Sequence, residues 1–178
     1  VYLYSSNSGI NIYKIQVDSS ASSGSGSSSS GSSTTDTSNG TVVTSFSELT
    51  AAVTKAEKAG GGIVYVKGSS ISCTAQLALK ASNANVSIIG VKNSDGTYPV
   101  LDFSAFRSAY IGKATTDSEV GIRISGSNYT IKNLIIQKAP DNGIQIKGSS
   151  AGNNTIENCM VRYNNDAAVQ ITGGAYSN

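Results

Sequence analysis

A short motif recurs three times in the last third of the chain, and this repeat constrains the fold more than any other feature. The copies read GIRISG from Gly121, GIQIKG from Gly143 and AVQITG from Ala168, so the spacing is 22 and then 25 residues. The last two copies share longer flanks, in register over nineteen positions from Thr130 and from Thr155. Because a period of about 20 to 50 residues is typical of a solenoid, the sequence predicts a coiled β repeat stacked rung on rung.

Short apolar segments separated by turn residues fill the chain beyond Gly62. Each is three to eight residues long, which is too short for an antiparallel sandwich with full hairpins. Roughly three such segments fit into one repeat period. We therefore expect an all-β fold, a right-handed parallel β-helix, over residues 41–178.

One helix is expected before the first rungs. Ser45 and Glu48 have the spacing of a capping box, in which each side chain bonds the backbone near the other. The run of three glycines at 60–62 should end the helix. Apolar residues recur between these limits at helical spacing: Phe46, Leu49, Ala52, Val53 and Ala56. We expect this amphipathic helix to cap the amino-terminal end of the β-helix, where the first rung would otherwise expose its edge.

The sequence before residue 41 differs in character. Residues 1–17 alternate like a hairpin, which predicts the end of a preceding β domain. Residues 18–40 are predicted to form a flexible linker, because twelve of the 21 residues from Ser19 to Asn39 are serine and large apolar side chains are absent. Such a linker favours a secreted, modular protein, and we expect the chain to be an internal piece of a longer polypeptide, since it begins at Val1 without Met.

Composition excludes several functions. Only 13% of the residues are charged and the net charge is +2, so nothing indicates a nucleic-acid partner, and no apolar run is long enough to span a membrane. The absence of histidine excludes histidine-based triads and dyads as well as zinc chemistry from this segment. Cys159 occupies the repeat position of Leu134, so we interpret it as a small buried hydrophobe; a disulfide with Cys73, or a reactive thiol, is the alternative.

A column of turn residues supports the stacking. Asn133, Asn158 and Gly90 fall at the same place in their rungs. Because Asn and Gly both tolerate left-handed backbone geometry, we expect a tight turn with positive φ at each position, and hydrogen bonds between the stacked Asn side chains.

An acidic column is the candidate metal site. Asp141 and Asp166 are 25 residues apart, each in the turn before a repeat strand. Adjacent strands lie about 4.8 Å apart, so the two carboxylates should be near neighbours, and calcium is the cation that such oxygen ligands suit. The alternative is that each Asp bonds the backbone of its own turn.

Basic side chains are spread over the last rungs: Arg123, Lys132, Lys138, Lys147 and Arg162. Along one face they would suit an anionic polysaccharide. Equally, they are what a solvated strand surface carries at alternate positions.

Residues from Thr44 to Asn178 resemble the amino-terminal half of the family-nine pectate lyases. The resemblance rests on FSELTAAV, GGGIVYVKG, PVLDFSAF and the three rungs that follow. It implies a secreted β-helix enzyme that cleaves polygalacturonate, an anionic plant cell-wall polysaccharide, by β-elimination. In that family calcium bridges the substrate carboxylate and protein aspartates, and a lysine removes the acidified proton at C5.

The family's calcium-holding motifs, approximately ADGFAAK and DDGxDL, do not occur in this sequence. Asp141 and Asp166 align with the rungs before them. The resemblance therefore implies a fragment of a lyase that is inactive alone because the catalytic rungs are missing. A non-catalytic β-helix that binds or adheres to polysaccharide is the alternative, and a hydrolase with paired carboxylates on the same fold is a third.

Overall fold

The computed structural model describes residues 35–116 and 118–175, together with the strands at 2–3 and 10–17. Two helices are described, α1 (Phe46–Lys58) and α2 (Ser104–Ser108). The strands are β1 (Tyr2–Leu3), β2 (Ile10–Val17), β3 (Thr41–Val43), β4 (Gly62–Val66), β5 (Ser70–Ser72), β6 (Leu77–Leu79), β7 (Val86–Gly90), β8 (Val100–Asp102), β9 (Ile122–Ile124), β10 (Tyr129–Lys132), β11 (Ile135–Gln137), β12 (Ile144–Lys147), β13 (Asn154–Arg162) and β14 (Val169–Thr172).

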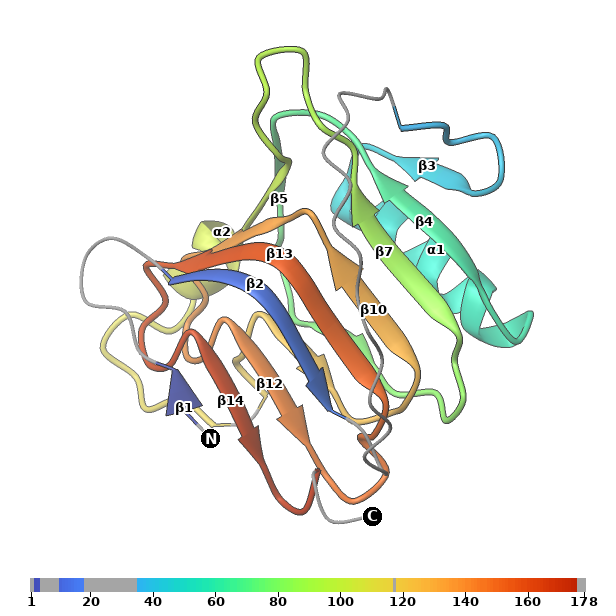
Figure 1. Ribbon diagram of the computed structural model, residues 1–178. Coiled ribbons are helices and arrows are strands. Elements are labelled where there is room, and N and C mark those ends of the chain that lie inside the picture. Colours follow the sequence, from blue (N-terminus) through green and yellow to red (C-terminus); the bar gives the residue numbers. More distant parts are fainter. Residues whose placement is uncertain (1, 4–9, 18–34, 117, 176–178) are drawn as a thin grey trace.

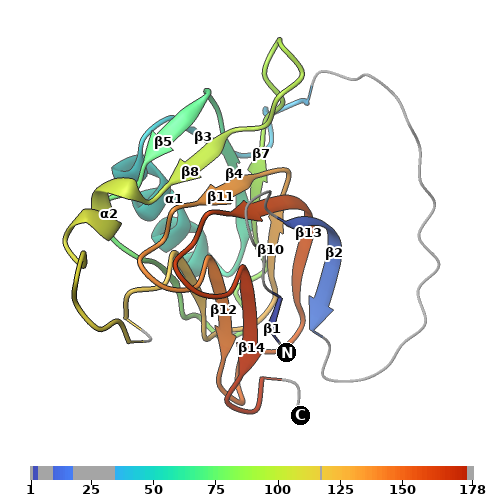
Figure 2. The same cartoon turned by 90° about the vertical axis from the view of Figure 1, so that its left-hand side faces the viewer.

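From β3 onward the described strands pair in parallel and form three stacks (Figures 1 and 2). The first stack runs β6, β9, β12, β14, and the second runs β3, β4, β7, β10, β13. The third runs β5, β8, β11 and again β13, because this long strand bends and contributes its second half there. The chain visits the stacks in turn, so the parallel, all-β arrangement that the repeat predicts is confirmed.

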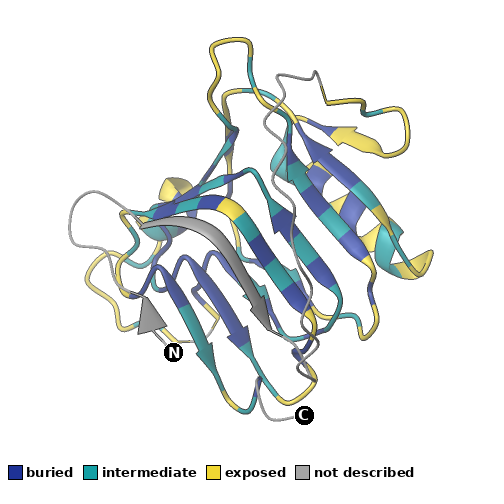
Figure 3. Cartoon of the chain, in the orientation of Figure 1, coloured by how far each residue is buried: buried dark blue, intermediate teal, exposed yellow. Residues whose placement is uncertain are grey.

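The core lies between the stacks. There, inward-facing side chains contact the side chains at the same register position in neighbouring rungs. Ile88, Ile131 and Ile156 are register partners in the second stack and are essentially fully buried. Burial alternates along β10 and β7, as expected for strands with one face on the core (Figure 3). Stacking like on like thus buries a continuous apolar column.

Helix α1 follows its sequence signals. The Ser45 hydroxyl accepts a hydrogen bond from the Glu48 amide, and the Glu48 carboxylate accepts one from the Ser45 amide, which confirms the capping box. The helix buries Leu49, Ala52 and Val53 and packs against β3, β4 and β7. Among the described residues, no helix is long and apolar enough to cross a membrane.

The predicted Asn column is confirmed at two of its three positions. Asn133 and Asn158 have φ of 59° and 49°, and Asn158 Nδ2 donates to Asn133 Oδ1 at 2.8 Å. The prediction is wrong for Gly90, which is not among the residues with positive φ. Glycine is required there for another reason: a Cβ would collide with the carbonyl oxygen of Asn133 on the next rung.

The amino-terminal strands lie at the opposite end of the stacks from α1 (Figure 1). β1 pairs antiparallel with β14, and β2 pairs antiparallel with β13. The assignment of residues 1–17 to a preceding domain remains a prediction. Most of the predicted linker, residues 18–34, lies outside the described part of the chain.

Candidate functional site

The turns that lead from the third stack to the first carry both predicted metal ligands. Asp141 lies between β11 and β12, and Asp166 lies between β13 and β14. The Asp166 amide donates to the Asp141 carbonyl oxygen at 3.3 Å, and the Asn165 amide donates to the same oxygen at 3.2 Å. The structure therefore brings the two turns together, as the rung spacing predicts.

The side chains at these turns supply only part of a calcium site. Asp141 is half-buried and Asp166 is exposed, and no group of three or more metal-binding side chains occurs within 35–116 and 118–175. Calcium takes about six to eight oxygen ligands. The nearby Asn165 Oδ1 already accepts a hydrogen bond from Arg107 at 3.0 Å. The residues present do not by themselves fit a calcium ion, and binding at the two aspartates remains a prediction.

Two asparagines hold the turns in place. Asn142 Oδ1 accepts a hydrogen bond from the Ala167 amide at 3.1 Å, and Asn164 Oδ1 accepts one from the Ala139 amide at 2.9 Å. Each bond joins one rung to the next across 25 residues of chain. Sequence reasoning gave these residues no role, although both sit beside the acidic column.

A basic hollow lies against the same turns. Its volume is about 190 Å³, and it is lined by Arg107, Tyr110, Ile111, Gly112, Lys113, Pro140 and Asn165. The first five belong to α2 and the segment after it, which is inserted between β8 and β9. The last two belong to the turns of the acidic column. The insertion thus builds one wall of the hollow and the rungs build the other.

Both cations of the hollow are held in place. The Arg107 guanidinium donates to the Tyr163 carbonyl oxygen and to Asn165 Oδ1, each at 3.0 Å. Lys113 Nζ donates to the Ala109 carbonyl oxygen at 2.7 Å and lies 6.0 Å from the centroid of the Tyr110 ring. The part of the lining that the structure describes includes no carboxylate. Sequence analysis missed both cations, although their segment fits no rung of the repeat and could have been recognised as an insertion.

Polar side chains form a ladder along the outside of the third stack. Gln137 Nε2 donates to Asp102 Oδ2 at 2.7 Å, and Arg162 Nε donates to Gln137 Oε1 at 2.8 Å. Burial on its own would raise the pKa of Asp102, but hydrogen bonds from Ser104, Gln137 and Lys138 outweigh it and lower that pKa to about 2. The carboxylate therefore stays ionised at neutral pH and anchors the ladder.

The basic residues predicted from the sequence do not form an unpaired stripe. Lys132 Nζ lies 2.6 Å from a carboxylate oxygen of Glu157, and Lys138 Nζ lies 3.1 Å from one of Asp102. Lys147 on β12 is registered opposite Thr172. Much of the positive charge on the rungs is thus compensated locally.

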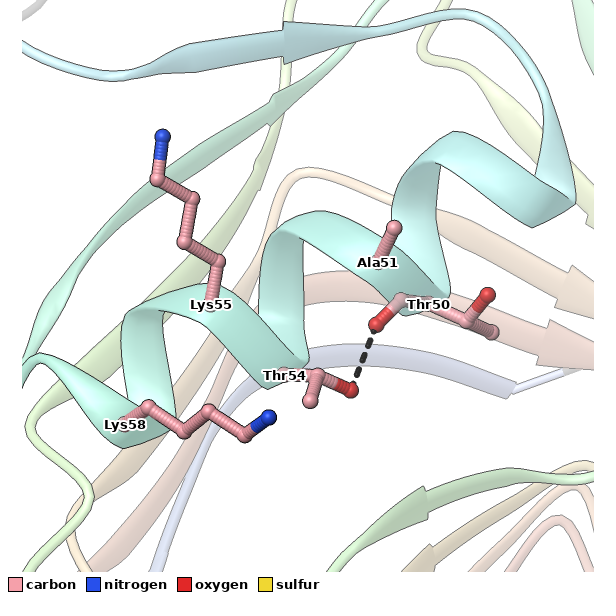
Figure 4. A pocket seen from close by; sticks show the side chains of 5 residues that line it. All are labelled: Thr50, Ala51, Thr54, Lys55 and Lys58. Atoms are coloured by element: carbon pink, nitrogen blue, oxygen red, sulfur yellow. Dashed lines mark hydrogen bonds between the residues drawn. The ribbon is translucent and has the colours of Figure 1, made fainter.

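A larger hollow of about 520 Å³ lies on the outer side of α1 (Figure 4). Its described lining comes from a single helix face: Thr50, Ala51, Thr54, Lys55 and Lys58. The Thr54 hydroxyl is occupied, because it donates to the Thr50 carbonyl oxygen at 2.9 Å. With one wall and no acidic side chain in its described lining, this surface is a poor candidate for a functional site.

The cysteines are structural. Cys73 and Cys159 are free and buried, which confirms the interpretation of Cys159 as a buried hydrophobe and excludes a disulfide between the two. Burial, together with the negative charge of Asp102, raises the pKa of Cys73 to about 12. Burial raises the pKa of Cys159 to about 11. Neither thiol is activated as a nucleophile.

Short parallel strands are stacked in three columns, and the turns of successive rungs meet at the same corner. This arrangement defines the class of parallel β-helix proteins. Residues 30–178 match the family model described as "Pel9A-like, right handed beta helix region", and the chain belongs to this family. The predicted resemblance to pectate lyases is thereby confirmed.

Pectate lyase L of Paenibacillus polymyxa (strain SC2) is 31% identical to the chain over 104 residues. This alignment covers 57% of the chain and 21% of that protein. The chain therefore spans about a fifth of the length of this relative. No solved structure matches the chain.

Proposed function

We propose that the chain is part of an extracellular, calcium-dependent pectate lyase that cleaves polygalacturonate by β-elimination. Family membership and the name of the matched relative support this proposal. In this proposal the stacks form a right-handed solenoid that α1 closes at its amino-terminal end. The serine-rich composition of residues 18–40 supports a modular, secreted protein.

The role we assign to this segment is to bind the polysaccharide beside the catalytic rungs. The observation that carries this role is the basic hollow, where Arg107 and Lys113 are fixed next to the turns of Asp141 and Asp166. Polygalacturonate carries one carboxylate on each sugar. A planar guanidinium and an ammonium held within one hollow suit two such groups.

The chemistry of elimination is assigned to other rungs. The sequence has neither the calcium motifs nor the lysine motif of the resembled family, so we expect no elimination by these 178 residues alone. A non-catalytic binding module is the second candidate, and it is favoured by a basic hollow without a cluster of three acidic side chains among the described residues. Unsaturated products from the longer protein that disappear with a chelator would support the lyase; binding without such products would support the module.

Binding is tested by electrophoresis of the chain through gels that contain polygalacturonate. Arg107→Gln and Lys113→Gln should each weaken retardation by about fivefold, on the order of 1 kcal/mol, because each removes a cation from the hollow. Lys58→Gln on the outer face of α1 is the matched control and should leave retardation unchanged.

Methyl-esterified pectin provides the second control, because it lacks most of the negative charge. Equal retardation by the esterified and the free polymer would contradict an electrostatic site. Equal effects of Lys58→Gln and Lys113→Gln would show that net charge, and not the hollow, governs binding.

A further inference from the structure

Eight residues other than glycine have a positive φ in the part of the chain that the structure describes, and they fall at the corners between stacks. Six of them are asparagine: Asn83, Asn85, Asn128, Asn133, Asn153 and Asn158. The other two are Lys138, with a φ of 60°, and Tyr163, with a φ of 57°. Asparagine visits the left-handed region because its short polar side chain bonds locally, which a long side chain does not do. Lys138 is therefore an exception to the way in which this chain fills its corners.

The corner imposes the left-handed geometry on Lys138 regardless of its side chain. Gln137 is registered with Arg162 in the third stack, so the residues that follow them, Lys138 and Tyr163, occupy equivalent positions one rung apart. Both have a positive φ. The Lys138 amide donates to the Arg162 carbonyl oxygen at 3.3 Å, which ties this corner to the next rung. Asparagine or glycine would suit the backbone at position 138 better than lysine does.

The ion pair of Lys138 does not offset this strain. Its ammonium nitrogen lies 3.1 Å from Asp102 Oδ2, and 45% of the lysine side chain is exposed. An exposed ion pair favours folding by about fivefold at most, whereas left-handed geometry disfavours it by roughly five- to thirtyfold. Stability alone therefore selects against lysine at this position.

Asp102 is held by other donors and does not depend on the lysine. Its Oδ1 accepts hydrogen bonds from the amide and the hydroxyl of Ser104, and its Oδ2 accepts one from Gln137 Nε2 at 2.7 Å. Burial raises the pKa of Asp102, and the bonds from Ser104 and Gln137 lower it more than the bond from Lys138 does. An ammonium has three N–H donors, so contact with Asp102 leaves donors on Lys138 for a second carboxylate.

Backbone strain that local contacts do not offset is typical of functional positions. We propose that Lys138 binds a carboxylate of an anionic sugar polymer, as a further binding residue beside the basic hollow. This inference rests on the proposed function. Pro140 of the hollow belongs to the same turn as Lys138, and Arg107 of the hollow donates to the carbonyl oxygen of Tyr163, the equivalent of Lys138 on the next rung. Because polygalacturonate carries one carboxylate on each sugar, one polymer strand can contact the hollow and Lys138 together.

Substitution by asparagine tests the backbone and the side chain at position 138 in one variant. Lys138→Asn suits the left-handed geometry and removes the cation. In the 178-residue chain it should raise the urea midpoint and weaken retardation in polygalacturonate gels by about fivefold. Lys138→Arg keeps both the cation and the strain, so it should be retarded like the wild type and show no gain in the urea midpoint.

Lys132→Asn is the matched control. Lys132 lies on the same rung, its ammonium nitrogen is 2.6 Å from Glu157 Oε1, and 37% of its side chain is exposed. Its backbone is not among those with positive φ. The control removes the same charge, so it should leave retardation unchanged. It should not raise the urea midpoint, because asparagine is disfavoured in strands.

Retardation of the wild-type chain distinguishes failure of the proposed function from failure of the role of Lys138. A wild-type chain that polygalacturonate does not retard would overturn both. If the wild type is retarded, an unchanged Lys138→Asn, or equal effects of Lys138→Asn and Lys132→Asn, would overturn the role of Lys138 alone. A lower urea midpoint in Lys138→Asn would also overturn it, because stability would then explain the lysine. Weak retardation of Lys138→Arg would show that the cation is not what the polymer contacts.

Discussion

At the residue scale, the turn column of Asn133, Asn158 and Gly90 accommodates the close packing of neighbouring rungs in two different ways. Asn133 and Asn158 adopt left-handed backbone geometry and bond each other through their side chains. Gly90 is there because the Asn133 carbonyl oxygen approaches it too closely for a Cβ. From the sequence, the occurrence of Asn and Gly in this column suggests that all three residues have positive φ. The structure shows that the glycine is instead required by close packing between rungs.

Substitutions at Asn158 should separate backbone geometry from side-chain bonding. Asn158→Ala loses both the tolerated positive φ and the bond to Asn133, so we expect it to lower the free energy of unfolding by about 2 to 3 kcal/mol. Asn158→Gly keeps the geometry and loses only the side-chain hydrogen bonds, to Asn133 and to the Tyr98 hydroxyl, and should cost clearly less. Urea unfolding measures both, and equal losses would mean that the positive φ is not a cost at this position.

At the element scale, hydrogen bonds hold α1 at its first turn and near its last turn. The capping box orders its first turn, and near its end the Glu57 carboxylate accepts a hydrogen bond from the Tyr129 hydroxyl at 2.5 Å. That hydroxyl also accepts from the Ala81 amide at 2.8 Å. Burial and the neighbouring Glu57 carboxylate raise the pKa of Tyr129, so the hydroxyl keeps its proton. One phenol thus ties the helix to two rungs.

Tyr129→Phe should loosen α1. The change preserves the ring but leaves the Ala81 amide and the Glu57 carboxylate without this partner, which we expect to cost about 1 to 3 kcal/mol. Hydrogen exchange within α1 should accelerate more than exchange in β14, in the far stack. Tyr98→Phe, a change in a turn hydroxyl that accepts from Asn158 Nδ2 at 3.2 Å, is the control and should not affect α1. Unchanged exchange in α1 after Tyr129→Phe would show that packing alone positions the helix.

At the scale of the whole molecule, stability is shared because each rung is supported by its neighbours. The buried isoleucine column of the second stack joins three rungs through Ile88, Ile131 and Ile156. A cavity in the middle of this column should therefore weaken the solenoid as a unit.

Ile131→Ala should lower the free energy of unfolding by about 2 to 5 kcal/mol, because it removes a fully buried side chain between two rungs. Val42→Ala is the control at a site that is 44% exposed, and its effect should be below about 1 kcal/mol. Fluorescence and circular dichroism should report the same transition in both variants. Two separate transitions in Ile131→Ala would indicate that the rungs on either side unfold independently.

What the sequence alone determined is what each repeat encodes locally. Strand positions follow from apolar alternation, the helix follows from Ser45, Glu48 and its apolar spacing, and the turn column follows from the rarity of left-handed backbone outside Asn and Gly. The equal spacing of Asp141 and Asp166 likewise predicts that their turns adjoin. These predictions are possible from sequence because stacking places residues that are one repeat apart next to each other in the structure.

Only the tertiary structure decided the contacts that break this period. Arg107 reaches Tyr163 and Asn165 across more than fifty residues, because an insertion between two rungs folds back on later turns. β2 meets β13 from the other end of the chain, against the direction of the repeat. Long-range contacts of this kind depend on how the stacked rungs and their turns are arranged in space, which no local pattern of residues records.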